Sequence, residues 1–166
     1  MMAERNIGGK FMWNSKRSAT LSIVVCFAFV LVLTAGLFFG PLAVRTWLCS
    51  YRGFEPGGEA LSYMIRLFSI CFYPSAVFAY ITLYSLLRLL FNIKKQEIFI
   101  FQNVSYLRRI SWCCFAVALI TLVGGIFYLP FLFVAIAAAF VGLMLRIVKN
   151  VMQNAVEIKA ENELTI

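Results

Sequence analysis

The sequence predicts an all-α membrane protein in which four transmembrane helices form one antiparallel bundle. Of its 166 residues, 63% are hydrophobic and 13% are charged, whereas a soluble domain is roughly 45–50% apolar and about 25% charged. Four apolar runs have the length of a bilayer crossing, which takes about 20 helical residues. Basic residues gather at the ends of these runs, where they orient a chain in an anionic membrane. We expect a single domain.

The first predicted span covers residues 21–40, and Lys16 and Arg17 precede it. A secretory signal peptide has a similar basic start and apolar run, and it is the alternative interpretation of this segment. We favour a retained helix because the run is longer than a usual signal-peptide core and no typical cleavage site follows it.

The second predicted span covers residues 67–91 and contains Pro74. Proline inside a helix removes one backbone hydrogen bond, so we expect a kink there. One interpretation of Pro74 with Ser75 and Thr82 is a hinge or a small ligand pocket. The simpler interpretation is a static kink whose freed carbonyl is satisfied by a neighbour.

The third and fourth predicted spans cover residues 110–128 and 131–148. One helix through both would be almost twice as long as the hydrocarbon requires. We therefore expect a tight helical hairpin with its joint marked by Gly124, Gly125 and Pro130.

The distribution of Lys and Arg predicts the orientation. Twelve of the fifteen basic residues lie in the N-terminal segment, around the loop between the second and third spans, or in the tail. The other three, Arg45, Arg52 and Arg66, lie on the opposite side. The positive-inside rule then predicts a multi-pass protein with both termini in the cytoplasm. Its first partner is the lipid bilayer.

Two segments outside the spans carry information. Asn103 follows the apolar stretch 98–101, and we expect it to cap a helix that continues into the third span. The tail, residues 149–166, is expected to extend the fourth span as an amphipathic cytoplasmic helix. The apolar stripe of this extension starts at the end of the fourth span and consists of Val148, Val151, Met152, Ala155 and Ile158.

No catalytic, metal or cofactor site is expected. The spans lack charge near their middle, which argues against proton relays and ion paths. The chain has no His, no Asp and no C-x-x-C pair, so the usual zinc, haem and thioredoxin-like signatures are missing. We predict a non-enzymatic protein, and we attribute basic residues beside aromatic ones to membrane anchoring rather than to direct nucleic-acid binding.

Small residues recur at helix-packing spacing, as in Gly36-x-x-x-Gly40, Ala135-x-x-x-Ala139 and Ala138-x-x-x-Gly142. We favour packing inside one bundle, and a homodimer formed through the same face is the alternative.

The acidic residues of the tail contrast with the basic loop. The simpler interpretations are ion pairs with that loop and plain solvation. The alternative is an acidic docking helix for a basic cytoplasmic partner. These acidic residues are Glu157, Glu161 and Glu163.

Two stretches carry a family resemblance. Residues 98–110 read I-F-I-F-Q-N-V-S-Y-L-R-R-I, and residues 157–166 read E-I-K-A-E-N-E-L-T-I. They resemble the motifs P-F-x-x-E-N-V-x-x-L-R-x-I and E-L-x-E-E-N-D-L-T-I of a bacterial four-span family, domain of unknown function 2975, the YoaS-like membrane proteins. Departures are Ile98, Gln102 and Glu163, and the change at Gln102 removes a carboxylate.

Members of that family are commonly encoded beside a very small helix-turn-helix regulator. The resemblance therefore implies a regulatory protein of the bacterial plasma membrane whose cytoplasmic loop and tail bind or sequester such a regulator. The candidate docking residues are Phe99, Asn103, Leu107, Arg108, Glu157, Glu161, Asn162, Glu163, Leu164 and Thr165.

The alternative function is that of an accessory subunit of a membrane transporter, or of a protein that handles an apolar ligand or confers toxin resistance. Its contacts would come from the outer loop, residues 41–63. The residues of interest there are Trp47, Cys49, Tyr51 and Phe54.

Overall fold

The structure is a computed structural model that describes residues 3–53 and 55–164, with side chains described for residues 20–53 and 55–162. The described residues form four helices and no strand. Each helix contains a segment that is long and apolar enough to cross a membrane, which confirms the predicted fold. The helices are α1 (Ala3–Arg52), α2 (Glu59–Lys94), α3 (Phe101–Gly125) and α4 (Pro130–Leu164).

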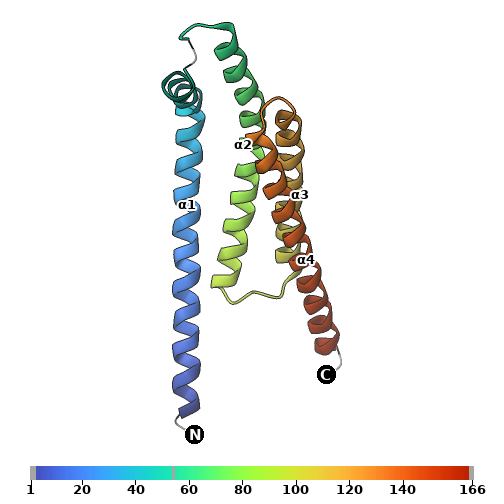
Figure 1. The fold of residues 1–166 in the computed structure, drawn as a ribbon. Helices are drawn as coiled ribbons and strands as arrows, with labels where there is room; N and C mark the ends of the chain where they lie inside the picture. The colour runs from blue at the N-terminus through green and yellow to red at the C-terminus, as the bar shows by residue number, and fades with distance from the viewer. Residues whose placement is uncertain (1–2, 54, 165–166) are drawn as a thin grey trace.

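Each helix packs against the next one in the chain (Figure 1). Contacts join α1 to α2, α2 to α3 and α3 to α4, and the α3–α4 interface is the most extensive of the three. Figure 1 shows the start of α1, the α2–α3 connection and the end of α4 at one end of the bundle, which we call the loop end. The opposite end holds the α1–α2 connection and the α3–α4 turn, and we call it the hairpin end.

The outer surface of the bundle is apolar. On α1, for example, the side chains of Leu31 and Phe38 are 72% and 80% exposed. A continuous apolar surface of this kind would be unstable in water, whereas hydrocarbon solvates it. The bundle therefore belongs in a lipid bilayer, as the composition predicts.

Helix α1 is much longer than the predicted span 21–40. Its 50 residues correspond to about 75 Å of helix. It continues through Pro41 as far as Arg52, so most of the predicted outer loop 41–63 is helical. The prediction was wrong there because a proline bends a helix without ending it when the remaining backbone bonds are kept. Figure 1 shows the last turns of α1 changing direction at the hairpin end.

The α3–α4 hairpin is confirmed. Helix α3 ends at Gly125 and α4 begins at Pro130, a residue well suited to the first turn because its missing N–H needs no partner there. A Cβ atom at Gly125 would lie 3.0 Å from the backbone nitrogen of Leu132. The absence of a side chain thus allows the two helices to approach closely at the turn.

Small residues also fill the contacts inside the bundle. The Cα of Gly36 faces the ring of Phe72 on α2, and that of Gly142 faces Phe115 on α3. Between α1 and α2, the hydroxyls of Thr34 and Tyr80 lie 2.8 Å apart and form a hydrogen bond. The small-residue spacing in the sequence is therefore used for packing between helices of the same chain.

Candidate functional site

At the loop end, the side chain of Asn103 holds the α2–α3 connection in place. Asn92 Nδ2 donates a hydrogen bond to Asn103 Oδ1 at 2.8 Å. Asn103 Nδ2 in turn donates to the backbone carbonyls of Glu97 and Ile98, each at 2.8 Å. The Asn103 side chain is fully buried. It therefore fastens the end of α2, the connection and the start of α3 to one another.

The prediction that Asn103 caps a helix was wrong. Helix α3 begins at Phe101, its N-cap is Ile100, and no side chain caps it. The polar groups that Asn103 satisfies belong instead to the preceding connection. This connection turns through Gln96, whose φ of 70° lies in the left-handed region. Asn92, the side-chain partner of Asn103, lies on another helix, so no local sequence pattern could have indicated the Asn92–Asn103 pair.

Several motif residues that follow Asn103 lie on the buried face of α3. Val104, Leu107 and Ile110 are all buried, and their spacing of three residues places them on one side of the helix. Arg108 lies on the exposed side. Asn103, Val104, Leu107 and Ile110 therefore maintain packing and support the surface. The motif residues Phe99, Gln102 and Arg108 are exposed.

The exposed surface of the connection is apolar and aromatic. Ile98, Phe99 and Phe101 are exposed, and the Phe101 side chain is 60% accessible. They follow the exposed Lys94 and Lys95 at the end of α2. Cationic and aromatic side chains together are typical of the level at which a protein leaves the hydrocarbon.

Three arginines at the loop end place their guanidinium groups over aromatic rings. The guanidinium carbons of Arg88 and Arg109 lie 5.5 and 6.0 Å from the ring centres of Tyr84 and Tyr106. A third pair joins α3 to α4, with Arg146 5.4 Å from the ring centre of Trp112. These distances permit cation–π attraction, which positions the charged groups around the bundle.

The predicted amphipathic tail is helical, but its buried face differs from the predicted stripe. Val156 is 4% exposed, whereas Val151 and Ile158 are 65% and 58% exposed. Met152 and Ala155 are half-buried. Contacts with α3 decide which face is buried, because in the described part of the chain α3 is the helix whose backbone lies close against α4. The tail thus keeps an exposed apolar ridge, formed by Val151 and Ile158.

The predicted docking residues divide into three groups. Phe99, Arg108, Glu157, Glu161 and Asn162 are exposed at the loop end. Asn103 and Leu107 are buried. Thr165 lies outside the described residues, and the side chains of Glu163 and Leu164 are likewise outside the description.

Ion pairing of the tail with the basic loop is not observed at Glu157. Its carboxylate accepts a hydrogen bond from Gln153 Nε2 at 3.0 Å, one turn earlier on the same helix. The carboxylate is exposed, so it remains accessible to a partner.

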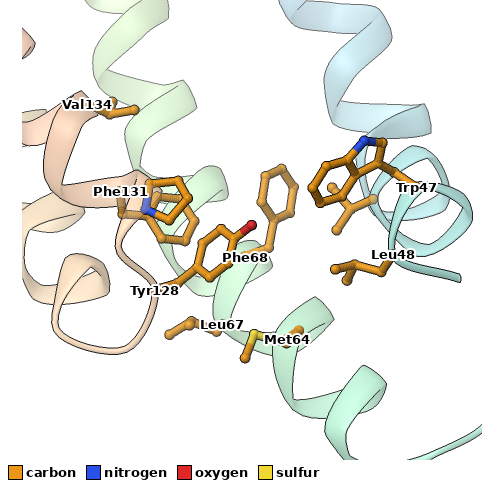
Figure 2. A pocket seen from close by; sticks show the side chains of 10 residues that line it. Trp47, Leu48, Met64, Leu67, Phe68, Tyr128, Phe131 and Val134 are labelled. Atoms are coloured by element: carbon orange, nitrogen blue, oxygen red, sulfur yellow. The ribbon is translucent and has the colours of Figure 1, made fainter. Parts of the chain in front are cut away.

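An apolar cavity of about 230 Å³ lies at the hairpin end. Figure 2 shows the rings of Trp47, Phe68 and Tyr128 around it, contributed by α1, α2 and the α3–α4 turn. Phe131 and Val134 from α4 also line it. Of the outer-loop residues of interest, Trp47 faces this cavity, and Phe54 lies outside the described residues.

A second apolar hollow of about 280 Å³ lies between the helices and is lined by Thr82 among others. Pro74 and Ser75 do not line it. Ser75 Oγ instead donates to the carbonyl of Cys71 at 2.7 Å inside α2. Thr82 is therefore placed at a hollow, as one interpretation expected, while Ser75 makes a contact inside its own helix.

Comparison with known proteins gives one family. The family model described as "Protein of unknown function (DUF2975)" matches residues 47–166, which include the end of α1 and all of α2, α3 and α4. Among the curated proteins and the solved structures, nothing matches the chain.

Proposed function

The chain belongs to the DUF2975 family, and starting from that membership we propose that it is a non-enzymatic regulatory protein of the bacterial plasma membrane. Its loop end faces the cytoplasm and binds or sequesters a small helix-turn-helix transcriptional regulator. The concentration of basic residues at the loop end supports this orientation.

The exposed ridge of Val151 and Ile158 is the observation that carries the proposal. The apolar run of α4 ends at Val148, yet two large apolar side chains remain exposed beyond it. An amphipathic helix with apolar anchors one or two turns apart is a common way to dock in the groove of a partner. Glu157 beside Ile158 adds negative charge, which complements the positive charge of a DNA-binding protein.

The α2–α3 connection supplies a second contact region. Phe99 and Phe101 are exposed there, and the hydrogen bonds of Asn103 fix the backbone that carries them. A preordered surface loses less conformational entropy on binding than a mobile one. Asn103 then acts on the partner only through the shape of the connection.

Co-purification tests the proposal. We replace Val151 and Ile158 by serine in the full chain and measure recovery of a small helix-turn-helix regulator of the kind proposed as the partner. We expect recovery to fall about tenfold or more, because a few central anchor residues contribute most of the binding energy of such an interface. Asn154→Ser on the same exposed stretch is the matched control and should leave recovery unchanged. Wild-type recovery with the double variant, at equal membrane insertion, would refute the docking role.

The apolar cavity at the hairpin end favours a second candidate function, the handling of an apolar ligand by a transporter accessory or resistance protein. Four aromatic rings line it (Figure 2), and ligand sites are typically apolar and concave. Val134→Phe should fill the cavity and reduce the amount of bound lipid-like ligand seen by native mass spectrometry. Val123→Phe, an exposed position outside the cavity, is the control. Equal ligand retention in both variants would contradict this function.

A further inference from the structure

A small cavity lined by charged side chains lies between α3 and α4 at the loop end, separate from the apolar cavities. It has a volume of about 80 Å³, enough for a few water-sized groups. Two helices contribute cationic side chains to it, and no acidic residue lines it. The lining residues are Arg108, Ser111, Trp112, Arg146 and Lys149.

No carboxylate among the described side chains neutralises the positive charge in this cavity. Within residues 20–53 and 55–162, Arg108, Arg146 and Lys149 form no ion pair with a carboxylate. Lys149 Nζ donates one hydrogen bond, to the neutral side chain of Asn150 at 2.9 Å, and an ammonium group has two more donors. Three cations held close together repel one another unless an anion lies between them.

The cavity is held in shape by contacts between the two helices. Ser111 Oγ is buried and donates to the carbonyl of Gly142 at 2.8 Å, one turn before Arg146. The Trp112 ring lies under the Arg146 guanidinium, with 5.4 Å between the guanidinium carbon and the ring centre. The cationic groups are thus placed by a rigid α3–α4 interface.

The cavity also lies at the edge of the apolar spans. The apolar run of α3 starts at Ile110 and that of α4 ends at Val148, so Arg108 and Lys149 lie just beyond the hydrocarbon. Lipid phosphates occupy this level, and exposed Trp112 is a residue typical of it. Arginine forks match phosphate oxygens with paired N–H donors.

From this arrangement we propose that Arg108, Arg146 and Lys149 form a binding site for a phosphate group, carried either by an anionic phospholipid or by a small soluble phosphate. The two arginines donate to the phosphate oxygens, and Lys149 adds a point charge. Binding draws the Arg146 guanidinium toward the phosphate and changes the environment of the Trp112 ring.

The test follows Trp112 by fluorine NMR in the full chain labelled with 5-fluorotryptophan, in bicelles of phosphatidylcholine. Trp112→Phe assigns the resonance. One arm adds phosphatidylglycerol to the bicelles, and the other adds inorganic phosphate to the buffer. A saturable shift in the first arm identifies the lipid as the source, and one in the second identifies soluble phosphate. No saturable shift in either arm would overturn the proposal.

Substitutions of the lining residues test which side chains bind the phosphate group. Arg108→Gln with Arg146→Gln should raise the titration midpoint about tenfold or more, because two charge-assisted contacts are lost. Arg45→Gln with Arg66→Gln removes the same charge at exposed positions outside the cavity and should change the midpoint by less than about twofold. Equal effects of the two pairs would contradict a built site.

A second variant guards against a folding defect in the arginine pair. If circular dichroism shows that the pair has lost helix, Lys149→Gln decides the question. It removes one charge from the same cavity and should raise the midpoint about threefold or more. A midpoint equal to that of the wild type would overturn the proposal.

Discussion

Replacement of Asn103 tests how the loop end is held together. Asn103→Ala removes one hydrogen bond with Asn92 and two with the carbonyls of Glu97 and Ile98. Each hydrogen bond contributes about 0.5–1.5 kcal/mol net, so the three together stabilise the connection by about 2–4 kcal/mol. Because the bonds join the connection to the ends of α2 and α3, the loss should be local and should leave the transmembrane helices assembled.

Asn103→Asp is the sharper variant. It has nearly the same shape and keeps an oxygen for Asn92, but it turns the donor to Glu97 and Ile98 into a second acceptor. A buried carboxylate facing two carbonyl oxygens is unfavourable, so its effect should equal or exceed that of alanine.

Hydrogen exchange of the backbone amides in residues 95–100 measures the effect. A loss of 2–4 kcal/mol corresponds to exchange that is roughly 30-fold to several hundred-fold faster. Asn154→Ala, at an exposed position in the tail, controls for the substitution itself. If Asn103→Asp exchanged at the wild-type rate, the hydrogen bonds assigned to Nδ2 would be wrong, and the burial of Asn103 would need another explanation.

Three further substitutions probe the packing of the helices, each measured as the free energy of unfolding in detergent by circular dichroism. Gly125→Ala should destabilise the protein by about 1–3 kcal/mol, because its Cβ would lie 3.0 Å from the backbone nitrogen of Leu132; an unchanged stability would show that the hairpin is looser than the structure indicates. Ser85→Ala should be neutral or stabilising by about 1 kcal/mol, since the buried Ser85 hydroxyl has no hydrogen-bond partner in the described part of the chain; a marked loss of stability would reveal a missing partner. Tyr80→Phe removes the hydrogen bond to Thr34 and should cost about 0.6 kcal/mol, a typical value for helices in lipid. Thr34 Oγ1 donates its own hydrogen to the carbonyl of Val30, so the Tyr80 hydroxyl is the donor in the Thr34–Tyr80 hydrogen bond. An unchanged stability of Tyr80→Phe would contradict this contact between α1 and α2.

The family motif gains a physical meaning from the structure. In sequence, the motif at residues 98–110 suggested a docking surface. In the structure, Asn103 closes the connection, and Val104, Leu107 and Ile110 form the packed side of α3. A partner would instead meet the exposed residues of this stretch, such as Phe99 and Arg108. Mutations in the buried part of the motif should therefore act through stability before they act through binding.

The sequence by itself determined the number of spans and the joint of the hairpin. Hydrocarbon excludes charge and requires every backbone group to be bonded within its own helix, so the apolar runs alone indicate where a chain can cross. Gly124, Gly125 and Pro130 indicate the joint through their own backbone chemistry. Neither inference needs knowledge of any distant residue.

Only the tertiary structure decided which side of each helix meets a neighbour. In lipid, residues that face the membrane are as apolar as those that face another helix, so hydrophobic periodicity does not distinguish the two faces. The buried face of the tail at Val156 follows from contact with α3. The clamp of Asn92 with Asn103 and the cationic cavity of Arg108 and Arg146 likewise arise where two helices meet, because each combines side chains from separate parts of the chain.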